Sequence, residues 1–116
     1  VRQAADDLSG GLTPDAEDSV RRAYRLMVEH LLPHERAEDR ELYPVVSDLL
    51  GAPGATDAMS RGHAEIERQV RRLGRQLSER ITPDQVDDLR ATLYGLDAIL
   101  TLHFAQEEEN YFTLTG

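Results

Sequence analysis

Three histidines and two glutamates interrupt apolar stripes that have the spacing of an α-helix. His34 and Glu38 interrupt the first stripe, His63 the second, and His103 and Glu107 the third. Each stripe advances in steps of three and four residues, which keeps its side chains on one face of a helix. Such a face packs into a core, where an imidazole or a carboxylate without a partner is costly. Because one metal ion can be the partner of all of them, we interpret these five residues as candidate metal ligands.

The spacing within the stripes also favours a shared site. The two His-x3-Glu pairs place their side chains about 6 Å apart on the same side of a helix. Three imidazoles and two carboxylates form a mixed nitrogen and oxygen donor set, which suits iron, manganese or zinc. Carboxylates can also bridge two ions, so a dinuclear site is one of the arrangements that remain open. The stripes are Val20, Tyr24, Met27, Leu31, His34, Glu38, Leu42; Met59, His63, Ile66, Val70, Leu73, Leu77; and Val86, Leu89, Leu93, Leu96, Leu100, His103, Glu107.

Other polar residues lie beside the stripes. His30, Glu35 and Glu67 are each about 100° from the nearest stripe, so we treat them as secondary candidates. A distortion at Pro33 could bring His30 or Glu35 inward. Some acidic residues are expected on solvated faces, namely Asp39, Glu41, Glu65, Glu108 and Glu109. Three tyrosines are expected to pack in the core or to donate a hydrogen bond to a ligand carboxylate, namely Tyr43, Tyr94 and Tyr111.

Capping signals predict the helices that must carry these residues. Thr13-Pro14-Asp15 and Thr82-Pro83-Asp84-Gln85 are typical helix starts, the second with a capping-box glutamine. Thr56 or Asp57 is expected to cap a helix between them. The three helices are predicted to end near Leu50, near Arg80, and at Glu109 or beyond, and residues 2–8 to be the end of an earlier one. No strand signal is present, so the predicted class is all-α.

Two prolines fall inside the first long helix. Pro33 and Pro44 each remove a backbone donor and clash with the preceding turn. We therefore expect kinks or breaks near Leu32 and Tyr43.

Composition limits the function classes. The 116 residues suit one domain spanning 1–116. The absence of cysteine excludes thiolate chemistry and iron–sulfur clusters. A net charge of −9 argues against a nucleic-acid surface. The sequence has no recognisable signal peptide and no apolar segment long enough to span a bilayer, so we expect no membrane association and a cytoplasmic location. Since Val1 is not an initiating methionine, we expect a processed chain or a piece of a longer one.

Three segments resemble the hemerythrin-like, or HHE cation-binding, domains in order and spacing. They are residues 34–44 (HERAEDRELYP), 61–66 (RGHAEI) and 103–109 (HFAQEEE), within a resemblance that covers about residues 14–114. The resemblance implies an up-down four-helix bundle around a non-haem diiron centre. By position, it implies terminal ligands at His34, His63 and His103. It also implies that Glu38, Glu107 and a solvent-derived oxygen bridge the two irons.

The chain departs from the family pattern at two places. The oxygen-carrying members have a second histidine four residues after the first on the third helix, where this chain has Glu67. This weakens the case for a reversible oxygen carrier and suits the HHE subgroup. The family also has a histidine on its first helix, whereas no histidine precedes His30 here. We therefore expect residues 1–10 to be the tail of a truncated first helix, and a homodimer or a helix of a parent chain to complete the bundle.

The resemblance implies binding or sensing of dioxygen, of reactive oxygen or nitrogen species, or of iron, with a small diatomic or peroxide ligand at the metal. Open coordination positions would also allow weak peroxidase- or oxidase-like chemistry. No nucleophile constellation predicts an enzyme. Two alternatives remain open: a metal-free helical interaction module, and a structural zinc or mononuclear site that ties the helices together.

Overall fold

The computed structural model describes residues 1–52, 54 and 56–108, and within these ranges it contains helices and turns but no strand. The α-helices are α1 (Arg2–Asp7), α2 (Pro14–Leu26), α3 (Leu32–Ala37), α4 (Tyr43–Leu50), α5 (Asp57–Leu77) and α6 (Val86–Glu107). Two 3-10 turns, η1 (Leu8–Gly10) and η4 (Pro83–Gln85), follow α1 and precede α6. Two π-turns, η2 (Met27–Leu31) and η3 (Glu38–Leu42), join α2, α3 and α4 into one rod. The all-α prediction is confirmed, and no described helix is both long and apolar enough to cross a bilayer.

The predicted helix starts are confirmed by their caps. The Thr13 side chain accepts a hydrogen bond from the Ala16 backbone N–H at 3.1 Å. Thr82 and Gln85 form the capping box, in which the Gln85 side chain accepts from the Thr82 backbone N–H at 3.0 Å. Thr56 is the N-cap of α5.

One predicted helix end differs in the structure, and another lies beyond the described residues. Helix α5 ends at Leu77 rather than near Arg80. The predicted extension to Glu109, like Tyr111, lies outside the described residues.

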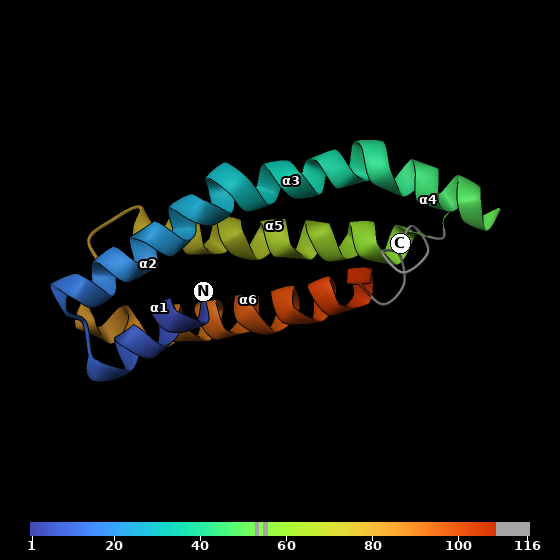
Figure 1. The fold of residues 1–116 in the computed structure, drawn as a ribbon. Coiled ribbons are helices and arrows are strands. Elements are labelled where there is room, and N and C mark those ends of the chain that lie inside the picture. Colours follow the sequence, from blue (N-terminus) through green and yellow to red (C-terminus); the bar gives the residue numbers. More distant parts are fainter. Residues whose placement is uncertain (53, 55, 109–116) are drawn as a thin grey trace.

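The helices lie along one long axis, in a molecule of about 52 × 22 × 18 Å. The α2–α4 rod and α6 both lie beside α5, and the short α1 packs against α2 and α6 (Figure 1). The main apolar core takes residues from α1, η1, the α2–α3 part of the rod, α5 and α6, including Leu8, Val20, Ile66, Leu73 and Leu93. A smaller cluster of Tyr43, Val46 and Met59 packs where α4 meets α5. Four helical segments thus enclose one core, which is consistent with a hemerythrin-type bundle.

Each predicted distortion is a π-turn that closes immediately before a proline. The backbone N–H of Leu32 bonds to the carbonyl of Met27, and that of Tyr43 bonds to the carbonyl of Glu38, five residues back in both cases. The next residue is Pro33 or Pro44, whose ring would clash with the carbonyl four residues back in a regular α-helix. The wider turn relieves that clash without ending the helix.

Each π-turn adds one residue to its turn and thereby rotates the following segment by about 100° relative to the sequence pattern. The buried positions accordingly jump by five residues, from Met27 to Leu32 and from Glu38 to Tyr43. The rotation turns His34 outward and Glu35 inward. The stripe predicted the opposite orientation for these two side chains, because it assumed an uninterrupted α-helical period.

Candidate metal centre

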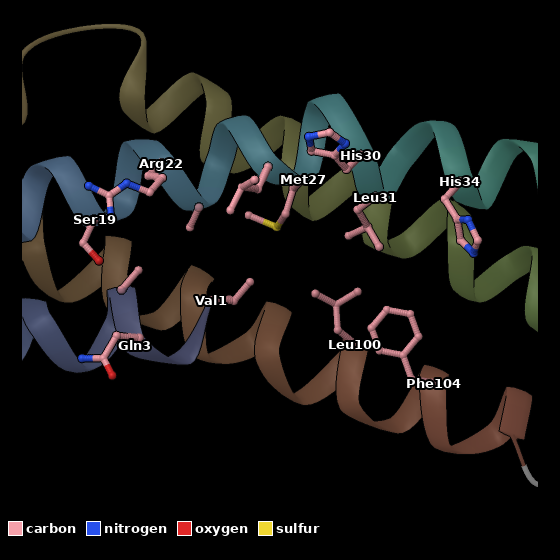
Figure 2. A pocket seen from close by; sticks show the side chains of 13 residues that line it. Val1, Gln3, Ser19, Arg22, Met27, His30, Leu31, His34, Leu100 and Phe104 are labelled. Carbon is pink, nitrogen blue, oxygen red and sulfur yellow. The ribbon is translucent and has the colours of Figure 1, made fainter.

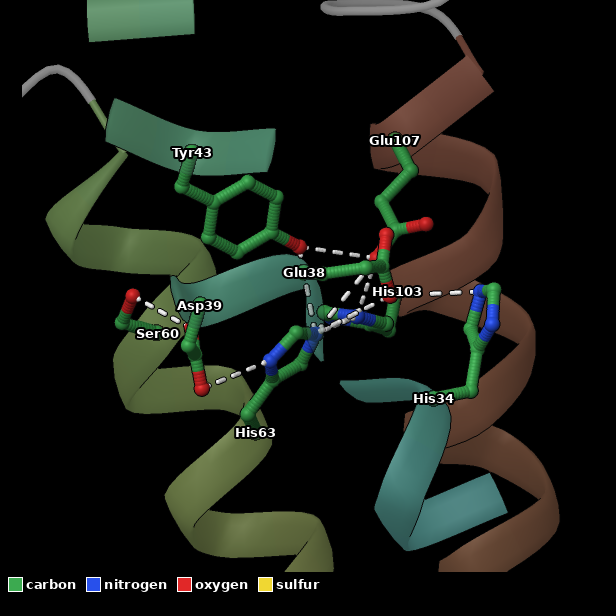
Figure 3. Close-up of polar contacts among 8 residues, drawn as sticks. All are labelled: His34, Glu38, Asp39, Tyr43, Ser60, His63, His103 and Glu107. Atoms are coloured by element: carbon green, nitrogen blue, oxygen red, sulfur yellow. Dashed lines mark hydrogen bonds and ion pairs between the residues drawn. The ribbon is translucent and has the colours of Figure 1, made fainter. Parts of the chain in front are cut away.

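Five ionisable side chains are buried together where the α3–η3 segment, α5 and α6 meet. Figure 3 shows all of them except Glu35. None is more than 5% exposed, and they are Glu35, Glu38, His63, His103 and Glu107. Helix α5 supplies one imidazole, α6 supplies the other together with Glu107, and the other two carboxylates flank the junction between α3 and η3. Burying so many ionisable groups in one place is costly unless they are paired with each other or with a cation.

The two imidazoles and one of the carboxylates are in direct contact. His63 Nε2 lies 2.7 Å from His103 Nε2, and Glu107 Oε1 lies 2.7 Å from the same His103 atom. The Tyr43 hydroxyl donates to Glu107 Oε1 at 2.8 Å and lies 3.1 Å from His63 Nε2. Tyr43 therefore has both of the roles considered for it, because it packs in the core with Val46 and Met59 and donates a hydrogen bond to a candidate ligand carboxylate.

The other two carboxylates have oxygens without hydrogen-bond partners. Among the described residues, these atoms are Oε1 and Oε2 of Glu38 and Oε1 of Glu35. Buried polar atoms are paired as a rule, so each such oxygen calls for an explanation. Glu38 Oε1 lies 3.7 Å from His34 Nε2 and 3.9 Å from His63 Nε2, close enough for an ion to bind between them. The orphaned oxygens therefore fit a bound cation.

In two sets of three residues, each residue offers one possible ligand atom, and the three atoms of a set all lie within 4.8 Å of one another. One set is Glu35, His63 and His103, and the other is Glu38, His63 and Glu107. Both sets combine imidazole nitrogen with carboxylate oxygen, which are the donors that iron, manganese and zinc accept. The shared His63 makes the two sets neighbours.

The electrostatics of the cluster follow from its burial. Burial, together with the nearby negative charge of Glu107, raises the pKa of Glu35 and of Glu38 to about 7. Burial alone would lower the pKa of His63, but its contacts with Glu107 and Asp39 raise it to about 9. Burial likewise opposes ionisation of Glu107, yet hydrogen bonds from His103, His63 and Tyr43 hold its pKa well below the usual range. Near neutral pH, Glu35 and Glu38 thus retain protons that a cation would displace.

His63 is also held from its other ring nitrogen. Its Nδ1 lies 3.2 Å from Asp39 Oδ2, and Ser60 donates to Asp39 Oδ1 at 2.8 Å. Asp39 was expected on a solvated face, but it is half-buried against α5. Gly62 allows a close approach on the same helix, because a Cβ atom there would lie 3.3 Å from His103 Nδ1.

The structure brings together four of the five predicted ligands, and His34 stands apart. The His34 side chain is 69% exposed at the edge of the cluster. Of the secondary candidates, Glu35 joins the cluster, His30 is exposed, and Glu67 is half-buried in an ion pair with Arg36. Pro33 was the sequence signal for Glu35, since it marks the distortion that turns this residue inward.

An apolar groove of about 780 Å³ lies between the α2–η2–α3 segment and α6 (Figure 2). Leu31, Leu100 and Phe104 line it, and His30 and His34 stand at its edge. The groove therefore reaches the side of the cluster that carries His34.

Comparison with known proteins gives the family. A family model described as the hemerythrin HHE cation binding domain matches residues 1–115. The chain belongs to the hemerythrin HHE cation-binding domain family. No curated protein and no solved structure matches it. Membership in the HHE family points to cation binding, and the buried His/Glu sets are this chain's candidates for holding the cation.

Proposed function

We propose that this HHE domain binds two non-haem iron ions in the buried cluster and thereby binds or senses dioxygen or a related small oxidant. The observation that carries the proposal is the pair of orphaned, buried carboxylates, Glu35 and Glu38, beside the imidazoles of His63 and His103. These oxygens lack partners within the described protein, and a cation would satisfy them. The donor set is one that iron accepts.

The side chains divide into holding and bridging roles. His63 and His103 would hold the ions through Nε2, the atoms that face each other and Glu107. Glu38 and Glu107 belong to the same candidate set and come from different elements, so they are suited to bridge two ions. His34 would complete the set after a change of rotamer, since its Nε2 already lies 3.7 Å from Glu38 Oε1. Iron bound there would supply electron exchange with dioxygen or peroxide.

The apolar groove supports a small, weakly polar ligand. It reaches His34, and most of its other side chains are apolar. A molecule such as dioxygen loses little hydration on entering such a surface, whereas a charged ligand loses much. Binding or sensing is the function that we propose, with weak peroxidase- or oxidase-like turnover as its secondary consequence.

The up-down order of the four helices and a cytoplasmic location belong to the same proposal. Completion of the bundle by a second copy or by a further helix stays a prediction. Light scattering on purified protein, with and without bound iron, would reveal a second copy.

Elemental analysis and absorption spectroscopy test the proposal. Protein reconstituted with ferrous iron without oxygen, then exposed to air, should retain about two irons per chain, as carboxylate-bridged bundles do. It should develop near-ultraviolet charge-transfer absorption that changes on reduction. Zinc retained in preference to iron would favour the structural-site alternative. Colourless, metal-free protein that melts at the same temperature with and without chelator would contradict the proposal and favour the helical interaction module.

A further inference from the structure

A second, polar cavity of about 110 Å³ lies between the α3–η3 segment and α5. Three carboxylates line it, those of Glu35, Asp39 and Glu67, together with the His63 imidazole and the Arg36 guanidinium. None of these residues lines the apolar groove. Two different openings therefore lead toward the same cluster.

The polar cavity connects the surface with the cluster. At its outer end the side chain of Arg36 is 56% exposed and that of Glu67 is 32% exposed. At its inner end Glu35 and His63 are buried, and both belong to a candidate metal set. Glu35 Oε1 has no hydrogen-bond partner among the described residues, although the residue is only 2% exposed. An unpartnered carboxylate oxygen at the inner end of a polar cavity would bind a cation that enters the cavity.

We propose that this polar cavity is the entry site through which a divalent cation reaches the buried cluster, and that the Arg36–Glu67 ion pair closes its outer end. The inference rests on the proposed metal centre and concerns how that centre is filled.

The cavity provides what a hydrated cation requires. A divalent ion gives up water when other ligands replace it, and the cavity offers two part-exposed carboxylates, Asp39 and Glu67, and a buried one, Glu35. The cavity volume holds an ion with part of its water shell, since one water occupies about 30 Å³. The apolar groove offers no carboxylate and carries Arg22 together with two histidines, so it disfavours a cation.

The two partners of the Arg36–Glu67 ion pair should have opposite effects on the rate of cation entry. Arg36 Nη2 lies 2.5 Å from Glu67 Oε1 and occupies a carboxylate at the exposed end of the cavity. Arg71 also approaches Glu67 Oε1, at 3.6 Å. Exposed pairs of this kind are weak and open readily. Removing Glu67 should therefore slow entry, and removing Arg36 should speed it.

The experiment measures the rate of metal uptake by the whole chain freed of metal. Cobalt(II) is the probe, because it is stable in air and its visible absorption reports coordination. Glu67→Gln and Arg36→Gln are mixed with cobalt in a stopped-flow instrument, and equilibrium dialysis gives the final cobalt content. Glu65→Gln and Arg68→Gln are the matched controls. This Glu–Arg pair lies on α5, the helix that carries Glu67, but it lines neither opening.

We expect Glu67→Gln to slow uptake and Arg36→Gln to accelerate it, each by roughly threefold or more, as local charge acts on cation encounter. The final cobalt content should equal that of the wild type, and the controls should keep the wild-type rate. Melting curves check that each variant is folded.

Five results would overturn the entry site. Rates that change in the same direction in both variants would indicate a structural ion pair. Changes matched by the controls would indicate a general charge effect. A lower final cobalt content in Glu67→Gln would make Glu67 a ligand. Unchanged rates with normal cobalt content would overturn the entry site alone, whereas a wild type that binds no cobalt and no iron would overturn the metal centre as well.

Discussion

Asp39 Oδ2 lies 3.2 Å from Nδ1 of His63, so a carboxylate holds this imidazole at the nitrogen that faces away from His103. The hydrogen bond from Ser60 fixes the orientation of Asp39 in turn. A carboxylate at Nδ1 favours the proton on that atom and leaves Nε2 available as a donor to a metal. Asp39 and Ser60 therefore position a candidate ligand without belonging to either metal set.

Asp39→Asn should weaken metal binding by about 10- to 100-fold, the usual effect of losing such a partner of a ligand histidine. Ser60→Ala should have a smaller effect in the same direction. Metal titration measures the affinity, and nitrogen chemical shifts of the His63 ring, recorded above its raised pKa of about 9 where the imidazole is neutral, report its tautomer. Asp87→Asn is the control, since this side chain is 97% exposed. If the tautomer and the affinity both stay as in the wild type, Asp39 does not position His63.

His103→Ala and His34→Ala should differ in their effect on stability. Both should lower the metal content. Only His103→Ala should also change the melting of the metal-free protein, because His103 is buried in hydrogen bonds with His63 and Glu107. His34 is exposed, so its removal should alter the free energy of unfolding by no more than about 0.5 kcal/mol. Unchanged metal content in His103→Ala would contradict the placement of the centre.

The metal-free protein should lose stability as the pH rises from about 5 to 8. The pKa of Glu35 and of Glu38 is raised from 4.5 to about 7, so the folded state holds protons that the unfolded state has released. Their stabilising contribution is complete below pH 4.5 and is lost as the pH passes 7, at roughly 3 kcal/mol for each carboxyl. The raised pKa of His63 acts in the same direction up to about pH 9.

Melting temperatures at several pH values in the presence of chelator measure this loss. A double variant, Glu35→Gln with Glu38→Gln, should flatten the pH profile. The same steep profile in the double variant would show that other groups cause it. In the metal-loaded protein the trend should weaken or reverse, because ion binding requires the deprotonated carboxylates.

Gly62→Ala should weaken metal binding although alanine is the better helix former. The added Cβ would lie 3.3 Å from His103 Nδ1, so the imidazole must shift. Gly95→Ala is the matched control on α6, where nothing lies within 4 Å of the added atom. That variant should gain up to about 1 kcal/mol of stability and bind metal normally. Equal metal affinity in the two variants would show that His103 tolerates the contact.

The sequence predicted the buried residues of two of the three stripes closely, because each of these stripes lies on one uninterrupted helix. Along α5, every residue of the second stripe from Met59 to Leu77 is buried, and along α6 the third stripe is buried from Leu89 to Glu107. Both helices are uninterrupted, so one period describes each from end to end. The first stripe crosses two π-turns, and beyond each of them the period is displaced by one residue.

The contacts between helices at the site could not be predicted from the sequence. Asp39 meets His63, and Tyr43 meets Glu107, through the distance and rotation between helices that are far apart in the chain. A periodic pattern describes one helix at a time and carries no such information. Pro33 and Pro44 did predict where the rod is distorted, but proline alone does not tell a kink from a break or a π-turn.

The π-turn before Pro33 also means that a change in backbone hydrogen bonding alone can substitute one donor for another. His34 and Glu35 are adjacent in sequence, and backbone register decides which of them faces α5 and α6. If η2 became an ordinary α-turn with no change of chain length, α3 would rotate by about 100° and the His34 imidazole would face inward in place of the Glu35 carboxylate. Deleting one residue from η2 together with the π-turn would instead keep Glu35 inward. A substitution of Pro33 that removes the π-turn would therefore exchange the donor atoms although no candidate ligand has mutated.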